Sequence, residues 1–191
     1  MKIKNFRNHL LISMPNINNT IFFKTVIYIY QNDKFGTKGI IINKKIKNLK
    51  LKKIFEQIKI NKKNKNFFKK NKKPILFGGP LEKNKGFIIH KFKKNFLSNI
   101  YSSPSISITF SKDILKYLIK KKKYKKTLIS LGYCSWEKNQ LEYEILNNYW
   151  LLTTSNNEIL FHTSLKKKWK KSLKKIGITN PYRLNIETGN I

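Results

Sequence analysis

Short runs of β-branched, aromatic and leucine residues recur along this chain, separated by glycine, asparagine or lysine. Such runs predict β-strands, because branched and aromatic side chains pack well on a pleated surface. The expected strands cover residues 9–14, 25–30, 39–43, a short segment after Pro74, 85–90, 105–110, 127–133, 149–154 and 158–163. The last two are expected to pair as a hairpin. Residues 31–39, which include Gly36 and Gly39, are expected to form a hairpin-type connection.

Four other segments repeat apolar residues every three or four positions, which predicts amphipathic helices. They are residues 48–60 with Leu51, Ile54, Phe55 and Ile58, residues 111–120 with Ile114, Leu115 and Leu118, residues 136–148 with Leu141, Ile145 and Leu146 facing inward, and residues 164–176 with Leu165, Trp169, Leu173 and Ile176. Asn48 and Ser111 stand at N-cap positions, Asp113 lies in a first turn, and Gly177 ends the last helix. Strands that are often adjacent, with helices interspersed, indicate an α+β fold.

No internal repeat and no glycine–serine linker divides the chain, so residues 1–191 are expected to form a single domain. Two lysine-rich runs, residues 61–73 and 120–126, predict solvated loops. With 40% hydrophobic and 13% aromatic residues, the chain can bury a sizeable core.

The net charge of +33 comes almost entirely from lysine, since Arg7 and Arg183 are the only arginines. A nucleic-acid surface favours arginine, because its planar guanidinium forms paired hydrogen bonds with phosphate and guanine. The chain also lacks alanine and has one valine, Val26, whereas residues with AT-rich codons are abundant. The lysine excess therefore indicates an AT-rich genome, and we expect only nonspecific polyanion binding at low salt.

Cys134 is the only cysteine, which excludes an internal disulfide and favours a reducing compartment. The apolar run from Leu10 to Met14 is interrupted by Ser13 and stopped by Pro15, so it is too short for the ~7–15 apolar residues of a signal peptide. No segment approaches the ~18 apolar residues of a membrane span. We therefore expect a cytoplasmic protein without a membrane span.

The helix expected at residues 164–176 sets an apolar stripe against a lysine-rich face. This pattern fits a membrane-surface helix, and it also fits a core-facing helix whose exposed face has filled with lysine. The stripe is narrow and ends at a glycine stop, which favours the core-facing helix.

Residues 131–145, LGYCSWEKNQLEYEI, contain the only cysteine, one of three tryptophans and three of nine acidic residues. We expect a strand-to-helix junction here. Gly132 would relax the backbone, Ser135 would be the N-cap, and Glu137 would lie in the first helical turn. The helix would then present a polar face formed by Gln140, Glu144 and Asn147 or Asn148.

A nucleophilic Cys134 is the alternative interpretation of this junction. The G-x-S-x-G turn that exposes a nucleophile requires glycine where this chain has Trp136. A lone cysteine more often acts as a small buried hydrophobic residue, so the structural role is favoured.

Two glycine motifs are weak signals of phosphate or RNA binding. FGGP at residues 77–80 lacks the phosphate-loop pattern, and GTKG at 36–39 resembles a KH-type RNA-binding loop but fits a hairpin turn better.

The three histidines, His9, His90 and His162, are scattered and accompany no cysteine pair, so they do not predict a zinc site. An enzyme would need a cleft that joins Glu144, Gln140 and a histidine such as His90. We assign no catalytic, cofactor-binding or metal-binding residue and expect no cofactor.

Several segments, taken in order, resemble the YqgE/AlgH family of bacterial proteins. They are HLLISMP with IFFKTVIYI, GTKGIIINK, FGGP with GFIIH, LGYCSWEKNQLEYEILNNYWL, and ILFHT with the downstream Trp169. The resemblance runs from about Leu10 to Gly177. Its most specific part is the pattern G-Y-x-x-W-x-x-x-Q-L-x-x-E-I, carried by Gly132, Tyr133, Trp136, Gln140, Leu141, Glu144 and Ile145.

This resemblance implies a single-domain α+β fold with a flattened, barrel-like, mostly antiparallel sheet and helices packed outside. The resemblance also implies a cytoplasmic protein, and no reaction is established for the family. Because the motifs are rich in turn and core residues and poor in catalytic groupings, we expect a non-enzymatic protein that acts through interactions, with a protein partner or a homo-oligomer. The names of some members suggest a nucleic-acid-associated transcriptional regulator as one alternative, and a hydrolase-type enzyme with an unrecognised site is another. Members usually have a small residue such as alanine at the position of Cys134, which argues against a nucleophile there.

Overall fold

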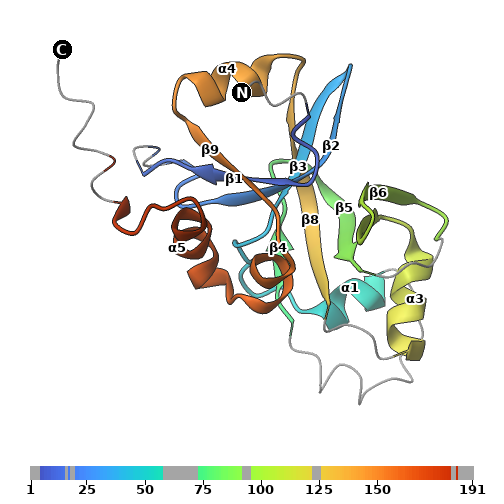
Figure 1. The fold of residues 1–191 in the computed structure, drawn as a ribbon. Coiled ribbons are helices and arrows are strands. Elements are labelled where there is room, and N and C mark those ends of the chain that lie inside the picture. Colours follow the sequence, from blue (N-terminus) through green and yellow to red (C-terminus); the bar gives the residue numbers. More distant parts are fainter. Residues whose placement is uncertain are drawn as a thin grey trace, which may run out of the picture.

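Nine strands form one curled sheet, and short helices cover its two faces (Figure 1). The computed structural model describes residues 5–15, 17, 20–57, 73–91, 96–121, 126–181 and 184. The strands are β1 His9–Ser13, β2 Val26–Asp33, β3 Gly36–Ile41, β4 Ile75–Phe77, β5 Leu81–His90, β6 Asn99–Ser103, β7 Ile106–Thr109, β8 Thr127–Trp136 and β9 Trp150–Thr154. The helices are α1 Leu51–Gln57, α3 Lys112–Lys121, α4 Gln140–Leu146, the π-helix η1 Glu158–His162 and α5 Leu165–Lys175.

The strand order is β6-β7-β5-β8-β3-β2-β1-β9, with β4 paired to β8 outside this path. Every pairing is antiparallel except β4 with β8. The sheet curls into a half-barrel, as expected for a barrel-like, mostly antiparallel α+β fold. In the described part of the chain, no helix is both long enough and apolar enough to cross a membrane.

Strand β8 joins the two halves of the sheet. Its first part, up to Leu131, pairs with β5 and β4, Tyr133 also pairs with Leu81 of β5, and its last three residues pair with β3. Between these parts lies Gly132, with a φ of 76°. The FGGP segment crosses the strand at this point, because Gly78 donates its N–H to the Leu131 carbonyl and accepts from the Ile41 N–H. The glycine motif is therefore a crossing of backbones at the corner of the sheet.

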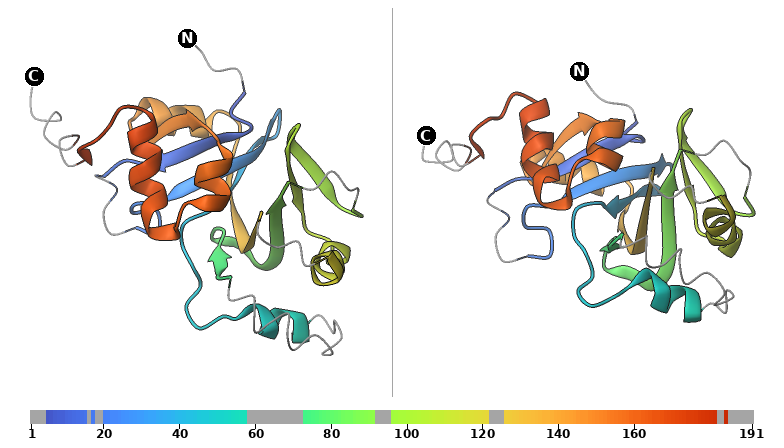
Figure 2. Two further views of the ribbon diagram at one scale, coloured as in Figure 1. Left: turned by 60° about the horizontal axis from the view of Figure 1, so that its bottom comes forward. Right: turned by 90° about the horizontal axis from the view of Figure 1, so that it is seen from below.

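Alternation along the strands divides the core between the two faces. One cluster contains side chains from both halves of the sheet, such as Tyr28 and Phe87, and α5 and η1 pack on it. The opposite face carries two clusters, one beside α1 and α3 and one beneath α4. Figure 2 shows α5 and η1 near the β1–β2 end of the sheet and α1 and α3 near the β5–β7 end.

The basic helix α5 faces the core, as favoured from its narrow apolar stripe. Trp169 and Leu173 are buried in the cluster shared by the two halves of the sheet. Trp169 donates its indole N–H to the Ser13 carbonyl at 3.0 Å. Gly177 follows the helix with a φ of 87°, the left-handed conformation that ends many helices.

The segment expected as the second strand of a final hairpin is instead the π-helix η1. Ile159 and Leu160 are adjacent and both buried, whereas successive side chains of a strand point to opposite faces. The Asn156 side chain accepts the Ile159 N–H at 2.7 Å and fixes the start of the turn. A run of β-formers was therefore misleading here, because tertiary burial overrides strand propensity.

Other boundaries also differ from the sequence prediction. Strand β2 extends to Asp33 and strand β3 begins at Gly36, so the turn between them is short. The GTKG motif therefore lies within β3 and does not form the turn. Asn48 is not the N-cap of α1, because it has a φ of 59° and the helix begins three residues later. Strand β6 was not predicted. Of the expected loops, 61–72 and 122–125 lie outside the described residues, while residue 120 belongs to α3.

Candidate functional site

A single carboxylate links three elements at the α4 end of the sheet. The Oε2 atom of Glu144 accepts the indole N–H of Trp136 at 2.8 Å and that of Trp150 at 2.7 Å. Its Oε1 atom accepts the Gln140 side-chain N–H at 2.9 Å. Charge-assisted bonds of this kind are about twice as strong as neutral ones. Glu144 therefore joins β8, α4 and β9 into one unit.

Aromatic packing fixes the same unit. Trp136 and Trp150 meet edge to face, with ring centroids 6.2 Å apart, and Phe22 packs edge to face on Trp150 at 5.5 Å. Such pairs add about 0.5–1.5 kcal/mol beyond the area that they bury. Both indoles are at least 95% buried and are held in one orientation by packing and by the carboxylate.

The two indoles form part of the lining of a cleft of about 560 Å³, which we call the Trp136–Trp150 cleft. Its wall is mainly apolar and aromatic. The lining residues are Ile17, Thr20, Phe22, Pro80, Leu81, Cys134, Ser135, Trp136, Gln140, Glu144, Tyr149 and Trp150. This size and lining are typical of ligand-binding clefts.

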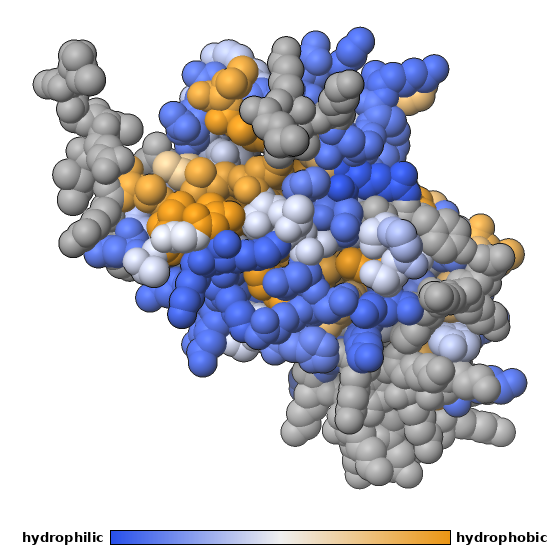
Figure 3. Space-filling model, in the orientation of Figure 1, coloured by the Kyte–Doolittle hydropathy of each residue, from blue (hydrophilic) through white to orange (hydrophobic). Residues whose placement is uncertain are grey.

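Exposed apolar side chains lie near the cleft. Leu146 is 80% exposed and Tyr143 is 64% exposed on α4, and Tyr149 follows the helix. Ile21 and Phe23 are also exposed in the segment between β1 and β2. Figure 3 shows hydrophobic surface on the face that carries α4 and β1, among hydrophilic surroundings. The helix was predicted to turn Leu146 inward, but only Leu141 of that helix is fully buried.

The strand-to-helix junction lies further along the chain than predicted. Ser135 is not the N-cap, because β8 continues through Trp136 in register with β3. The helix begins at Gln140 after Asn139, which has a φ of 66°. Glu137, three residues before the start of the helix, donates its backbone N–H to the Gln140 side-chain oxygen at 2.9 Å. The polar face pairs Gln140 with Glu144, as expected from their spacing.

Cys134 is one of the lining residues of the cleft and is a buried thiol. The residue is 3% exposed, and its Sγ lies 3.7 Å from the Gly78 carbonyl oxygen. Burial raises the pKa of the thiol to about 12. A thiol of this kind is a poor nucleophile at neutral pH, since the thiolate is the reactive form. This environment supports the structural role favoured for the cysteine.

Cys134→Ala is therefore expected to leave the fold intact and to lower the free energy of unfolding by about 1–2 kcal/mol. Urea unfolding checks the stability. The native thiol should also react with a maleimide or disulfide reagent far more slowly than the same thiol in urea. Equal labelling rates in the two conditions would contradict a buried, protonated thiol and would restore the nucleophile interpretation.

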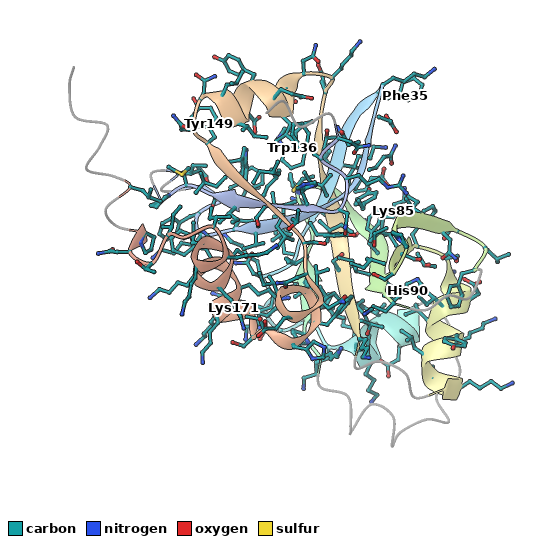
Figure 4. All side chains as sticks on the ribbon, in the orientation of Figure 1. Phe35, Lys85, His90, Trp136, Tyr149 and Lys171 are labelled. Atoms are coloured by element: carbon teal, nitrogen blue, oxygen red, sulfur yellow. The ribbon has the colours of Figure 1, made fainter. Side chains whose placement is uncertain are left out.

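The histidine considered for an enzyme site lies elsewhere. His90 pairs with Thr127 at the start of β8, whereas Trp136 is at the end of that strand. Figure 4 places His90 well away from Trp136 and Tyr149. Its Nε2 lies 2.8 Å from the Thr109 Oγ1, and burial lowers its pKa to about 4. The structure thus brings Gln140 and Glu144 together but does not bring His90 to them.

Lys168 was not predicted as a notable residue, since it is one of several lysines on α5. It is 1% exposed, and its Nζ donates to the carbonyl oxygens of Ile159 and Leu160 in η1 at 2.6 and 2.5 Å. Burial, and secondarily the charge of Lys73, lowers its pKa to about 7. This lysine attaches α5 to the π-helix, and no sequence pattern distinguishes it from its exposed neighbours.

The lowered pKa of Lys168 predicts a stability that rises with pH. Between about pH 7 and its ordinary pKa of 10.5, the unfolded chain holds a proton on this amine that the folded chain has released. Raising the pH across this window therefore favours the folded state. Lys73, whose pKa burial lowers to about 8, acts in the same direction. The unfolding free energy measured by urea titration should rise from pH 7 to pH 9, by about 2 kcal/mol from Lys168 and by about 1 kcal/mol more from Lys73.

Lys168→Met should remove most of this rise, and Lys174→Met on the exposed face of α5 should retain it. A stability that does not change with pH in the native protein, or the same pH dependence in both variants, would contradict the assignment of the effect to Lys168.

Among the described residues, no group of three or more histidine, cysteine, aspartate or glutamate side chains is arranged to hold a metal ion.

Comparisons with known proteins give consistent results. A family model described as AlgH-like matches residues 10–181. A UPF0301 protein of Buchnera aphidicola subsp. Baizongia pistaciae is 46% identical over 98% of this chain and 99% of its own length. The UPF0301 protein YqgE of Escherichia coli K12 is 40% identical over 91% of this chain and 93% of its own length.

Two solved structures are also similar. The solution structure of the AlgH protein from Pseudomonas aeruginosa has a TM-score of 0.79 and 27% identity, and the match covers 100% of this chain and 98% of that one. Protein DIP2367 from Corynebacterium diphtheriae has a TM-score of 0.68 at 14% identity, with coverage of 92% and 89%. The second likeness concerns the fold alone.

Proposed function

We propose that this chain, which belongs to the AlgH-like family, is a non-enzymatic protein. It would bind a protein partner through the Trp136–Trp150 cleft. The observation that carries the proposal is the combination of an apolar cleft of about 560 Å³ with exposed Tyr143, Leu146 and Tyr149 beside it. Contiguous exposed apolar surface next to polar surroundings is typical of protein interaction sites. Tyr149 lines the cleft and is 46% exposed, and tyrosine is one of the residue types enriched among the anchors of such sites.

The chemistry of the cleft supports binding rather than catalysis. The carboxylate of Glu144 accepts three hydrogen bonds and has no basic or nucleophilic partner among them. Burial raises the pKa of the Cys134 thiol to about 12, and the buried His90 lies at the other end of β8. General acid–base catalysis needs two groups within hydrogen-bond reach of one reacting centre. The groups in this cleft instead hold aromatic rings in position.

We place this binding activity in the cytoplasm, because thiols are kept reduced there and the chain has a single cysteine. We attribute the +33 charge to solvated lysines, which bind polyanions weakly and lose them with salt. The apolar face of the basic helix α5 packs in the core, which supports a core-facing helix rather than a membrane-surface one.

Leu146→Lys is expected to abolish the partner complex without affecting the fold. Leu146 is 80% exposed, so the substitution should change the unfolding free energy by less than about 0.5 kcal/mol, whereas a charge at an apolar interface disfavours binding. Leu97→Lys is the matched control, since Leu97 is 89% exposed and lies between β5 and β6.

The tagged chains would be expressed in Escherichia coli that lacks its own YqgE protein, and the complexes would be sized by sedimentation velocity after gentle extraction. We expect a heavier species for the native chain and for Leu97→Lys, and the monomer alone for Leu146→Lys. A species of twice the chain mass identifies a homo-oligomer. Equal behaviour of the two lysine variants would refute binding at this surface.

A further inference from the structure

We infer that the Trp136–Trp150 cleft takes the cationic end of a lysine or arginine side chain from its partner. This inference rests on the proposed function and specifies the partner: a protein segment in which a basic residue is flanked by apolar ones. It follows from three properties of the cleft, which are the unused acceptor of its carboxylate, its aromatic walls and its local charge.

The first property is the hydrogen-bond count at Glu144. An ionised carboxylate offers about four acceptor positions. Among the described residues, Trp136 and Trp150 occupy two of them on Oε2, and Gln140 occupies one on Oε1. One position remains on Oε1, and Glu144 is a lining residue of the cleft. A ligand that donates an N–H there completes the coordination of the carboxylate.

The position of the unused acceptor also determines the kind of donor. Both indoles use Oε2, so a guanidinium cannot form the paired bond that needs both carboxylate oxygens. The ligand can therefore donate a single hydrogen bond to Oε1 of Glu144, and an ammonium group and a guanidinium group can both donate it. The cleft therefore selects for a positive charge rather than for the shape of arginine.

The second property is the aromatic wall. Phe22, Trp136, Tyr149 and Trp150 line the cleft together with the carboxylate. A cation within about 6 Å of an aromatic ring centre is attracted by the ring, most strongly by tryptophan. Burying a charge costs free energy unless it is paired, and here a carboxylate and several rings offset that cost. The methylene stem of lysine or arginine suits the apolar part of the wall.

The third property is the charge of the surroundings. Among the described residues that line the cleft, Glu144 is the only charged one, in a chain of net charge +33. Screening reduces the repulsion from lysines farther away than about 8 Å at physiological salt. The lining itself therefore carries one negative charge and no positive one, which makes it complementary to a basic side chain.

The test uses the three tryptophans of the chain as reporters. Each gives one indole N–H resonance in a ¹⁵N-labelled protein, and Trp169, buried against β1, is the internal control. Acetyl-Leu-Arg-Leu-amide would be titrated at 0.15 M salt against acetyl-Leu-citrulline-Leu-amide, which has nearly the same shape and no charge. We expect the Trp136 and Trp150 resonances to shift with the arginine peptide, the Trp169 resonance to stay, and the citrulline peptide to bind at least about fivefold more weakly.

Glu144→Gln should reduce this preference to less than about twofold, and Glu142→Gln on the same helix should keep it. An unchanged Trp169 resonance shows that each variant is folded. Equal binding of the two peptides at Trp136 and Trp150 would overturn the cation inference and leave the proposed partner-binding cleft in place. No shift of either resonance with the arginine peptide at millimolar concentration would overturn the inference as well, and Leu146→Lys then decides the proposed function separately.

Discussion

Gly79→Ala is expected to prevent stable folding, whereas Gly86→Ala should be tolerated. A Cβ atom on Gly79 would lie 2.2 Å from the carbonyl carbon and oxygen of Tyr133 and 2.6 Å from the backbone nitrogen of Cys134. These are main-chain atoms, so no side-chain rotation relieves the contact. At Gly86 the nearest atom is a Leu131 methyl group at 3.8 Å, an ordinary contact.

The clash at Gly79 lies where β8 passes from one half of the sheet to the other, so relief requires the crossing to open. We expect a loss above about 4 kcal/mol, a large share of the 5–15 kcal/mol that stabilises a typical domain. Gly86→Ala should change stability by less than about 1 kcal/mol. Circular dichroism and urea unfolding of both variants measure this difference. A Gly79→Ala protein with a native midpoint would contradict the backbone crossing.

Glu144→Ala is expected to cost about 3 kcal/mol and to loosen both cleft indoles. The substitution removes one acceptor from Trp136 and from Trp150, and it leaves two mostly buried N–H groups without their partner. Leaving a buried donor unsatisfied costs about 1–3 kcal/mol per group, and partial access to water reduces the sum. Glu144→Gln keeps one acceptor oxygen and should cost about half as much.

Urea midpoints and near-ultraviolet circular dichroism would follow this loss, with Glu142→Gln as the control for removing a charge from the same helix. The dichroism of the tryptophans should weaken in Glu144→Ala and not in the control. If Glu144→Ala and Glu142→Gln were equally stable, the carboxylate would not be the link between β8, α4 and β9.

The sequence predicted most strands and the helices of this fold because their periodic patterns are local. Residues 127–133 were recognised as a strand, which the structure extends to Trp136, and α5 was correctly expected to face the core. The family was recognised from the motif around Trp136, and the similarity to AlgH-like proteins confirms it. The π-helix was missed because Ile159 and Leu160 belong to a β-rich run that is placed by tertiary contacts.

The candidate site was only half predictable. The four-residue spacing of Gln140 and Glu144 places them on one helix face, and the structure pairs them at 2.9 Å. The role of the carboxylate depends on Trp136 from the preceding strand and Trp150 from the following one, and periodicity within one element does not reveal such a meeting. Lys168 is a similar case, since its burial depends on the position of η1.

The most direct test of partner binding at the Trp136–Trp150 cleft is photo-crosslinking from residue 149. A photoreactive amino acid would replace Tyr149, which lines the cleft and is 46% exposed, and in a second protein it would replace Phe35, which is 79% exposed at the tip of the β2–β3 hairpin. Figure 4 shows the two positions on different parts of the molecule. After irradiation in growing cells, we expect one discrete heavier product from position 149, absent when Leu146→Lys is added, and no such product from position 35. The same products from both positions, or none from position 149, would contradict recognition of a partner at this cleft.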